Sequence, residues 1–256
     1  MPAGVRPRLS ARIVRVTSLD PQTRDSMWRL FEAYYDGADA GRFHRDLDDK
    51  DHAIIVRNED HAVVGFSTLL RYGRAFRGRR CVIVFSGDTI LDARYWGDRS
   101  LQNAFGRYIT ATKLMHPFRP VYWFLVSKGY KTYLLLARNF PTHWPRHDRT
   151  TPEWVHGLID ALARERFGAA WRPELGVVRY DRPHDRLRTG VASPDASALR
   201  NADVRFFVHA NVAHAMGDEL ACLGRIGFAL WARYVVKRMR LRPAAGNVEV
   251  RPTWSA

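Results

Sequence analysis

The sequence contains few cysteines and no long apolar run. Its two cysteines, Cys81 and Cys222, lie far apart in apolar segments, and their spacing fits neither a metal site nor a disulfide framework. We therefore expect two buried free thiols and no metal site. No segment reaches the roughly 18 uninterrupted apolar residues of a membrane-spanning helix, which disfavours an integral membrane protein.

A secretory signal, internal repeats and low-complexity tracts are also missing. Residues 1–16, MPAGVRPRLSARIVRV, are basic but lack the apolar segment and the small-residue cleavage site of a signal peptide. A chain of 256 residues, 46% of them apolar, is long enough for one large domain, or for a domain with an extension, around a substantial core. We expect a cytoplasmic, globular protein.

Acidic residues are scarce relative to basic ones. The sequence has 41 Lys and Arg against 26 Asp and Glu, a formal net charge of +15. Such an excess favours an acidic partner: nucleic acid, anionic lipid, a phosphorylated cofactor or an acidic carrier protein. Zinc-ligand spacings, RNP aromatics and a clear helix-turn-helix are missing, so nucleic acid is not the expected partner.

The first 140 residues predict alternating strands and helices. Asp20 and Pro21 mark the start of the first helix, as a capping residue and a first-turn proline. Periodicity predicts a strand at 11–17, a helix at 22–35, a hairpin at 52–72, a strand from 82, a helix at 101–115, a strand at 121–126 and a helix at 130–139. This order fits an α/β sandwich with a mixed sheet flanked by helices.

A segment rich in proline, histidine and arginine, residues 141–149, marks a boundary. Beyond it the pattern predicts a helix at 153–167, a strand at 203–209 and a long helix at 218–241. Residues 237–242 are basic, which suits anionic lipid or an acidic carrier protein as well as ordinary helix-dipole compensation. We divide the chain into a core, residues 1–140, and a C-terminal α+β extension, residues 141–256, packed on that core.

A glycine-containing turn follows the strand that begins at Val82. Residues 95–100, YWGDRS, lead directly into the helix predicted at 101–115. A strand, a short glycine loop and a helix in this order let backbone N–H groups and a helix N-terminus face an anion such as a pyrophosphate. An ordinary strand-to-helix turn produces the same pattern.

The order of these elements resembles the GNAT acyltransferase superfamily (the Gcn5-related N-acetyltransferases). In that family the pyrophosphate of an acyl thioester binds the loop after the fourth strand, and the thioester lies where the fourth and fifth strands splay apart. The resemblance covers residues 11–140 and places the loop at 96–101 and the fifth strand at 121–126. It implies a GNAT-like mixed sheet and a donor that is an acyl-CoA or an acyl-carrier-protein thioester.

The loop departs from the glycine-rich motif of the family. Gly97 matches the first glycine, but Arg99 and Leu101 stand at the second and third, and Trp96 replaces the arginine that opens the loop. Side chains at these positions hinder close approach of a pyrophosphate to the backbone. Three explanations stay open: Arg94 and Arg99 supply the charge, a carrier protein holds the donor, or the resemblance is only architectural.

The resemblance and the polar strand ends define the candidate site residues. Asp88 follows Ser86-Gly87 and is the candidate base, with a role in a bulge as the alternative. Tyr133 is the candidate acid for the leaving thiolate, with core packing as the alternative. The candidate acceptor-binding residues are Tyr130 and Asn211. The candidate donor-binding residues are Arg94, Trp96, Gly97, Asp98, Arg99, Ser100, Lys128 and Lys131.

The sequence thus predicts an acyltransferase that moves an acyl group from an acyl-CoA or acyl-carrier-protein thioester to an amine of a small metabolite or lipid precursor. Two alternatives stay open. One is a non-catalytic basic binding protein on a GNAT-like scaffold, which the missing glycines favour. The other is a peripheral membrane protein, held at an anionic surface such as the inner membrane by residues 218–242.

Overall fold

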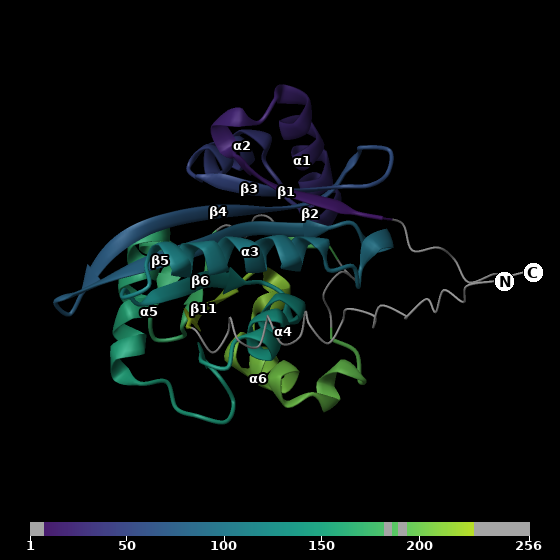
Figure 1. The fold of residues 1–256 in the computed structure, drawn as a ribbon. Coiled ribbons are helices and arrows are strands. Elements are labelled where there is room, and N and C mark those ends of the chain that lie inside the picture. Colours follow the sequence, from purple (N-terminus) through teal and green to yellow (C-terminus); the bar gives the residue numbers. More distant parts are fainter. Residues whose placement is uncertain (1–7, 182–185, 189–193, 228–256) are drawn as a thin grey trace, which may run out of the picture.

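The chain folds around one large mixed β-sheet (Figure 1). The computed structural model describes residues 8–181, 186–188 and 194–227. The spatial order of the sheet is β1-β3-β4-β5-β6-β11-β9-β8, and β7 also pairs with β11. Its strands are β1 (Ser10–Arg15), β3 (His52–Arg57), β4 (Val63–Phe76), β5 (Arg79–Leu91), β6 (Val121–Ser127), β7 (His143–Trp144), β8 (Trp171–Arg172), β9 (Val177–Val178) and β11 (Glu219–Ile226).

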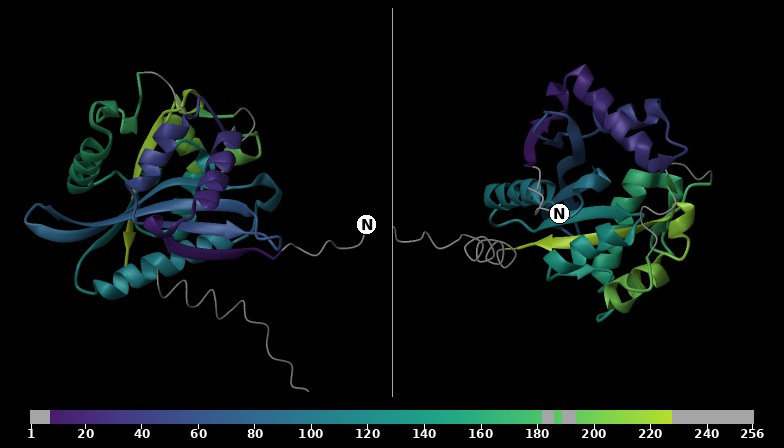
Figure 2. Two further views of the ribbon diagram at one scale, coloured as in Figure 1. Left: turned by 90° about the horizontal axis from the view of Figure 1, so that it is seen from above. Right: turned by 90° about the vertical axis from the view of Figure 1, so that its right-hand side faces the viewer.

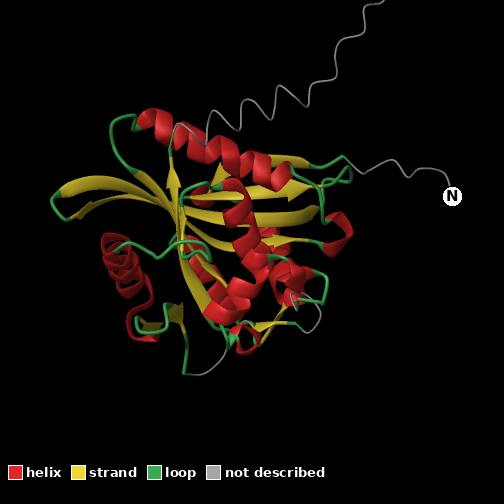
Figure 3. Cartoon of the chain, turned by 90° about the horizontal axis from the view of Figure 1, so that it is seen from below, coloured by secondary structure: helices red, strands yellow, loops and turns green. Residues whose placement is uncertain are grey.

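Helices cover both faces of this sheet (Figures 2 and 3). The helices are α1 (Pro21–Tyr34), α2 (Ala40–Asp48), α3 (Ser100–Met115), α4 (Tyr130–Asn139), α5 (Glu153–Phe167) and α6 (Ala202–Ala210). The first helix begins as the sequence predicts, because the carboxylate of Asp20 accepts the N–H of Thr23 at 2.8 Å. A separate small sheet pairs β2 (Tyr35–Asp36) with β10 (Arg186–Leu187).

Alternating side chains of the central strands divide the core between the two faces. Val82 and Val84 point into a cluster shared with α3, α4 and α6, whereas Ile83 and Phe85 point into a cluster under α5. The helices α1 and α2 cover a third cluster that includes Phe66 of β4. Because the central strands are apolar on both faces, they form a continuous apolar layer at the middle of the molecule.

No helix of the described ranges has both the length and the apolarity needed to cross a bilayer.

The sheet is antiparallel except at its centre. Strand β5 runs parallel to β6, and every other neighbouring pair of the sheet is antiparallel. A crossover through α3 joins β5 to β6, as a parallel connection requires. The β4–β5 hairpin projects beyond the rest of the sheet at the left of Figure 1. These features confirm the mixed sheet flanked by helices that the sequence predicts.

Two predicted elements are wrong. Residues 203–209 lie in the helix α6, not in a strand, and Asn201 caps it by accepting the N–H of Asp203 at 2.8 Å. Residues 219–226 form the strand β11, not the start of a long helix. The rest of that predicted helix, and with it residues 228–242 of the proposed membrane-binding segment 218–242, lies outside the described residues.

Strand β11 joins the C-terminal part of the chain to the main sheet. It pairs with β6 from Leu220 opposite Ser127 to Ile226 opposite Val121. The extension therefore does not only pack on the sheet of residues 1–140 but supplies strands to it. The division at residue 140 stays a prediction about the chain, since one continuous sheet crosses it.

Candidate functional site

The parallel strands β5 and β6 separate toward their carboxyl ends. They pair over five positions, from Val82 opposite Val121 to Ser86 opposite Leu125. Beyond Ser86, β5 continues to Leu91 paired only with β4. Strand β6 instead continues to Ser127 in register with β11. The sheet thus opens between these two strands, and the opening begins beside Gly87 and Asp88.

A β-bulge lies at the start of this opening. Two residues of β5, Gly87 and Asp88, stand opposite one residue of β4, Thr68, so the pairing register shifts. Gly87 is needed for close packing: a Cβ there would lie 2.6 Å from the Thr68 hydroxyl oxygen and 3.1 Å from Cε of Lys50. The bulge re-aims the side chain of Asp88 where the two strands part.

Charged side chains from five segments meet around this bulge. Lys50 is buried and donates to the carbonyl and the carboxylate of Asp46 at 2.7 and 2.6 Å. The ammonium of Lys128, just after β6, lies 3.3 Å from a carboxylate oxygen of Glu219 at the start of β11. The guanidinium of Arg166, at the end of α5, lies 3.5 Å from a carboxylate oxygen of Asp46. We call this set the charged cluster, and its members are Asp46, Lys50, Asp88, Lys128, Arg166 and Glu219.

Asp88 differs from the other carboxylates of the charged cluster. Asp46 and Glu219 have cationic partners, but among the described residues none is hydrogen-bonded or ion-paired to Asp88. The pKa of Asp88 is raised to about 7, mainly by burial and also by the nearby carboxylate of Asp46, whereas the charges of Lys128 and Lys50 oppose the rise. A carboxyl with a pKa near neutrality is suited to accept and release a proton.

Burial in the charged cluster also changes the pKa of Lys50. Burial lowers the pKa of this lysine, while the carboxylate of Asp46 opposes the change. Its ammonium also lies 5.8 Å from the ring centroid of Phe85 on β5. The hydroxyl oxygen of Thr68 has no hydrogen-bond partner among the described residues, although it is buried. The bulge is therefore bordered by polar groups whose hydrogen-bonding capacity is not fully used.

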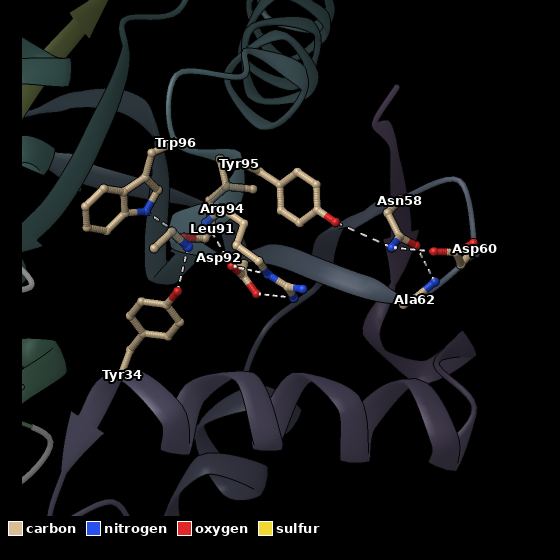
Figure 4. Close-up of polar contacts among 10 residues, drawn as sticks. Tyr34, Asn58, Asp60, Ala62, Leu91, Asp92, Arg94, Tyr95 and Trp96 are labelled. Carbon is tan, nitrogen blue, oxygen red and sulfur yellow. Dashed lines mark hydrogen bonds and ion pairs between the residues drawn. The ribbon is translucent and has the colours of Figure 1, made fainter. Parts of the chain in front are cut away.

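Hydrogen bonds within the protein hold the loop between β5 and α3 (Figure 4). The N–H of Ala93 donates to the hydroxyl of Tyr34 on α1 at 2.6 Å, and Nε1 of Trp96 donates to the carbonyl of Leu91 at 2.9 Å. An anion could bind their N–H groups only after these bonds were broken. The other loop residues whose backbone N–H donates internally are Arg94, Tyr95, Trp96, Asp98 and Ser100.

The side chains of this loop are also engaged. Arg94 donates to the carboxylate of Asp92 at 3.1 and 2.8 Å, and these hydrogen bonds lower the pKa of Asp92 (Figure 4). Gly97 has φ +95°, a left-handed conformation that favours glycine. The half-exposed Trp96 lies under Lys131 of α4, whose ammonium is 3.6 Å from the ring centroid. Trp96 and Lys131 thus connect the loop to α4.

The two predicted tyrosines, Tyr133 and Tyr130, both lie on α4. Tyr133 is fully buried between α4 and α6, and its hydroxyl donates to the carbonyl of Pro145 at 3.0 Å. Burial raises the pKa of Tyr133 above its usual range. These surroundings match the core-packing alternative, and the role as an acid stays a prediction. Tyr130 is half-buried in the first turn of α4, beside the end of β6.

Asn211 connects three elements. It ends α6 and is buried, and its side-chain amide donates to the carbonyls of Asp218 at 2.8 Å and Ser127 at 3.4 Å. Asn211 therefore ties α6 to the ends of β6 and β11. Its role in binding an acceptor stays a prediction.

The structure brings together some predicted residues and adds others. Asp88 and Lys128 meet in the charged cluster, whereas Arg94 is paired with Asp92 on the loop. Sequence reasoning missed Lys50, Asp46, Glu219 and Arg166. The charged segment at residues 42–51 contained two of them, but only the fold shows that they face the bulge.

Comparisons with known proteins gave matches only among solved structures. No protein-family model matches the chain, and no curated protein matches it in sequence. A probable N-acyltransferase from Enterococcus faecalis is 14% identical with a TM-score of 0.39; the match covers 64% of this chain and 45% of that one. The chain thus corresponds to less than half of the length of that protein.

Two further matches are shorter proteins. A GNAT-family N-acetyltransferase from Escherichia coli, solved with CoA, is 14% identical over 56% of this chain and 79% of its own, with a TM-score of 0.38. Glucosamine-6-phosphate N-acetyltransferase from Arabidopsis thaliana is 10% identical over 57% of this chain and 99% of its own, with a TM-score of 0.40. Identity and TM-score are low in each case, so the fold assignment rests on the chain's own strand order. The chain has a GNAT-like fold. Two features show it: the strand order of the mixed sheet, and a central parallel pair that opens at its carboxyl end.

Proposed function

We propose that this protein is an acyltransferase that moves an acyl group from a thioester, acyl-CoA or acyl carrier protein, to the amine of a small acceptor. The observation that supports this most is Asp88: a carboxylate without a partner among the described residues, with a pKa of about 7, at the bulge where β5 and β6 part. An amine acceptor is an ammonium ion at neutral pH, and it must lose a proton before it can attack a carbonyl.

Asp88 is proposed to take that proton. With a pKa of about 7, a large fraction of this carboxyl is ionised at neutral pH, and its conjugate acid is not too weak to release the proton again. The neutral amine nitrogen then attacks the thioester carbonyl carbon and the carbon–sulfur bond breaks. The proton that the nitrogen loses as the amide forms balances the proton that the leaving thiolate takes up. Lys50 and Lys128 favour the ionised form of Asp88 through their charge.

The opening between β5 and β6 is proposed to receive the thioester. The unpaired edge of β6 past Leu125 and the edge of β5 past Ser86 offer backbone groups at the same place as Asp88. A pyrophosphate fits the loop at 92–100 only partly, because most of its N–H groups donate within the protein. The cationic side chains of Arg99 and Lys131 would hold the phosphates instead.

A second candidate function is a non-catalytic basic binding protein. The occupied amides of the loop and the pairing of Arg94 with Asp92 favour it, since both reduce what the loop offers to a pyrophosphate. This alternative predicts binding of an acidic partner that weakens steeply with salt, and no release of thiol.

The test is thiol release from acyl-CoA donors of different chain length, with small amines as acceptors and the full chain as enzyme. We expect acceptor-dependent thiol release that Asp88→Asn reduces about 100-fold or more. The matched control is Asp25→Asn, an exposed carboxylate on α1, which should leave the rate within twofold of the starting protein, roughly the effect of a surface change. No acceptor-dependent release from any donor, or equal rates in both variants, would reject the assignment.

A further inference from the structure

An apolar tip projects from the opposite end of the β5–β6 pair. Phe118 is 98% exposed, and Leu114 and Met115 at the end of α3 are 60% and 55% exposed. These three residues form what we call the apolar tip. A single exposed apolar side chain on a surface is ordinary, but three large ones in five consecutive positions, one of them almost without protein contact, need a reason.

The loop that carries Phe118 is built to hold this position. The ammonium of Lys113 lies within hydrogen-bond distance of the carbonyls of His116 at 3.5 Å, Pro117 at 2.9 Å and Arg119 at 3.0 Å. These bonds fix the backbone on both sides of Phe118. The side chain therefore stays outward because the loop holds it there, although the hydrophobic effect favours its burial.

Exposed arginines border the apolar tip. Arg119 follows Phe118 directly, whereas Arg107, two turns before Leu114 on α3, donates to the carbonyl of Ala11 at 3.3 Å. Arg80 lies beside Arg119, because Val82 pairs with Val121 and its N–H donates to the carbonyl of Pro120 at 2.9 Å. An apolar projection inside a rim of cations suits an anionic bilayer, where the arginines meet phosphate groups and the apolar side chains enter the interface.

The end of the described chain lies at the same edge. Ile226 of β11 pairs with Val121, three residues after Phe118, and the described residues stop at Gly227. The sequence that follows, residues 228–242 (FALWARYVVKRMRLR), is apolar and strongly basic. The basic residues of this sequence suit an anionic surface, as do the arginines beside the apolar tip.

We propose that the apolar tip inserts into the interface of an anionic lipid bilayer. A folded partner would need a pocket for Phe118, whereas a bilayer accepts a projecting side chain of any shape. A nucleic acid would stack on the aromatic ring alone and leave Leu114 and Met115 uncovered. The proposal does not depend on acyl transfer, because the tip is at the amino end of β5 and β6 and the charged cluster is at their carboxyl end.

The experiment is co-sedimentation of the full-length protein with phosphatidylcholine vesicles that contain or lack phosphatidylglycerol. We expect binding to the anionic vesicles only. Phe118→Glu should weaken it about tenfold. The matched control, Val212→Glu, makes the same change at another apolar residue, 80% exposed, near the end of α6, and should bind like the starting protein. Arg80→Gln should weaken binding about fivefold.

Two results would overturn the proposal. The first is absence of binding to the anionic vesicles, or equal binding by Phe118→Glu and Val212→Glu. The second is a dimer that Phe118→Glu converts to a monomer in light scattering, because a second copy of the chain would then cover the tip. Thermal melts of the variants show whether each stays folded, which the exposure of both residues leads us to expect.

Discussion

At the scale of single residues, Asp88 connects the chemistry of this protein to its stability. Its carboxyl has a pKa of about 7 in the folded chain, against about 3.9 in an unfolded one. The folded state therefore holds a proton that the unfolded state has lost between these two values. Ionised Asp88 costs stability, so the penalty grows as pH rises from about 4 to about 7 and is complete above that.

Replacement of Asp88 by asparagine should remove this penalty. We expect Asp88→Asn to raise the free energy of unfolding at pH 8 by roughly 1–2 kcal/mol, since partial exposure screens part of the effect. At pH 4 the two proteins should be equally stable. Urea denaturation at both pH values measures this, and an equal effect of the substitution at pH 4 and pH 8 would contradict the raised pKa.

Gly87 is a second residue whose identity the site requires. A methyl group at this position would collide with the Thr68 hydroxyl and press on Lys50. We expect Gly87→Ala to lower the free energy of unfolding by about 1–3 kcal/mol, from overpacking. Gly73→Ala on β4 is the control, because nothing lies within 4 Å of a Cβ there. Equal effects of the two substitutions would show that the bulge does not hold Lys50 against Gly87.

At the scale of elements, the sequence predicted well those segments that turn residues bound, such as Pro120 before β6 and Gly129 between β6 and α4. Helix α4 has the predicted bounds, and β6 differs by one residue. The misassigned β11 is apolar on both faces: Leu220 and Cys222 face one cluster, and Ala221 and Leu223 face the other. An element buried on both sides has a continuous apolar run, which a helix buried on all sides also shows.

The strand predicted at residues 203–209, where the structure has α6, was wrong for a related reason. Its run Arg205-Phe206-Phe207-Val208 is rich in aromatic and β-branched residues, which favours a strand by propensity. The tertiary structure overrides this preference, because Val204 and Phe207 are three residues apart and both are buried on the side of α6 that meets the core. Local sequence does not contain that information.

Packing of α4 against β11 allows a direct test of the corrected element. A Cβ at Gly224 would lie 2.9 Å from Cδ1 of Leu136 and 3.1 Å from Cδ1 of Phe140, both on α4 or its end. We expect Gly224→Ala to destabilise the protein by roughly 1–3 kcal/mol in urea denaturation. In a helix the same change would stabilise by about 1 kcal/mol, so a gain in stability would contradict the strand.

At the scale of the whole molecule, the candidate site comes from parts of the chain that are far apart. Asp88 stood out in the sequence because it follows a glycine at a strand end. Lys50 lies between α2 and β3, Arg166 ends α5, and Glu219 begins β11. Glu219 joins the charged cluster because β11 lies beside β6, and β11 is one of the two elements that the sequence misassigned. The charged neighbours of Asp88 come from separate parts of the chain, so local sequence could not predict that they lie close to it.

The central claim is that Asp88 acts as a base where β5 and β6 part. The most direct test is the pH dependence of kcat/KM for acceptor-dependent thiol release, measured from pH 5.5 to 9 in steps that bracket the Asp88 pKa of about 7. The account predicts a rate that rises with pH through a midpoint near 7 and a loss of that midpoint in Asp88→Asn. An unchanged midpoint in Asp88→Asn would contradict it.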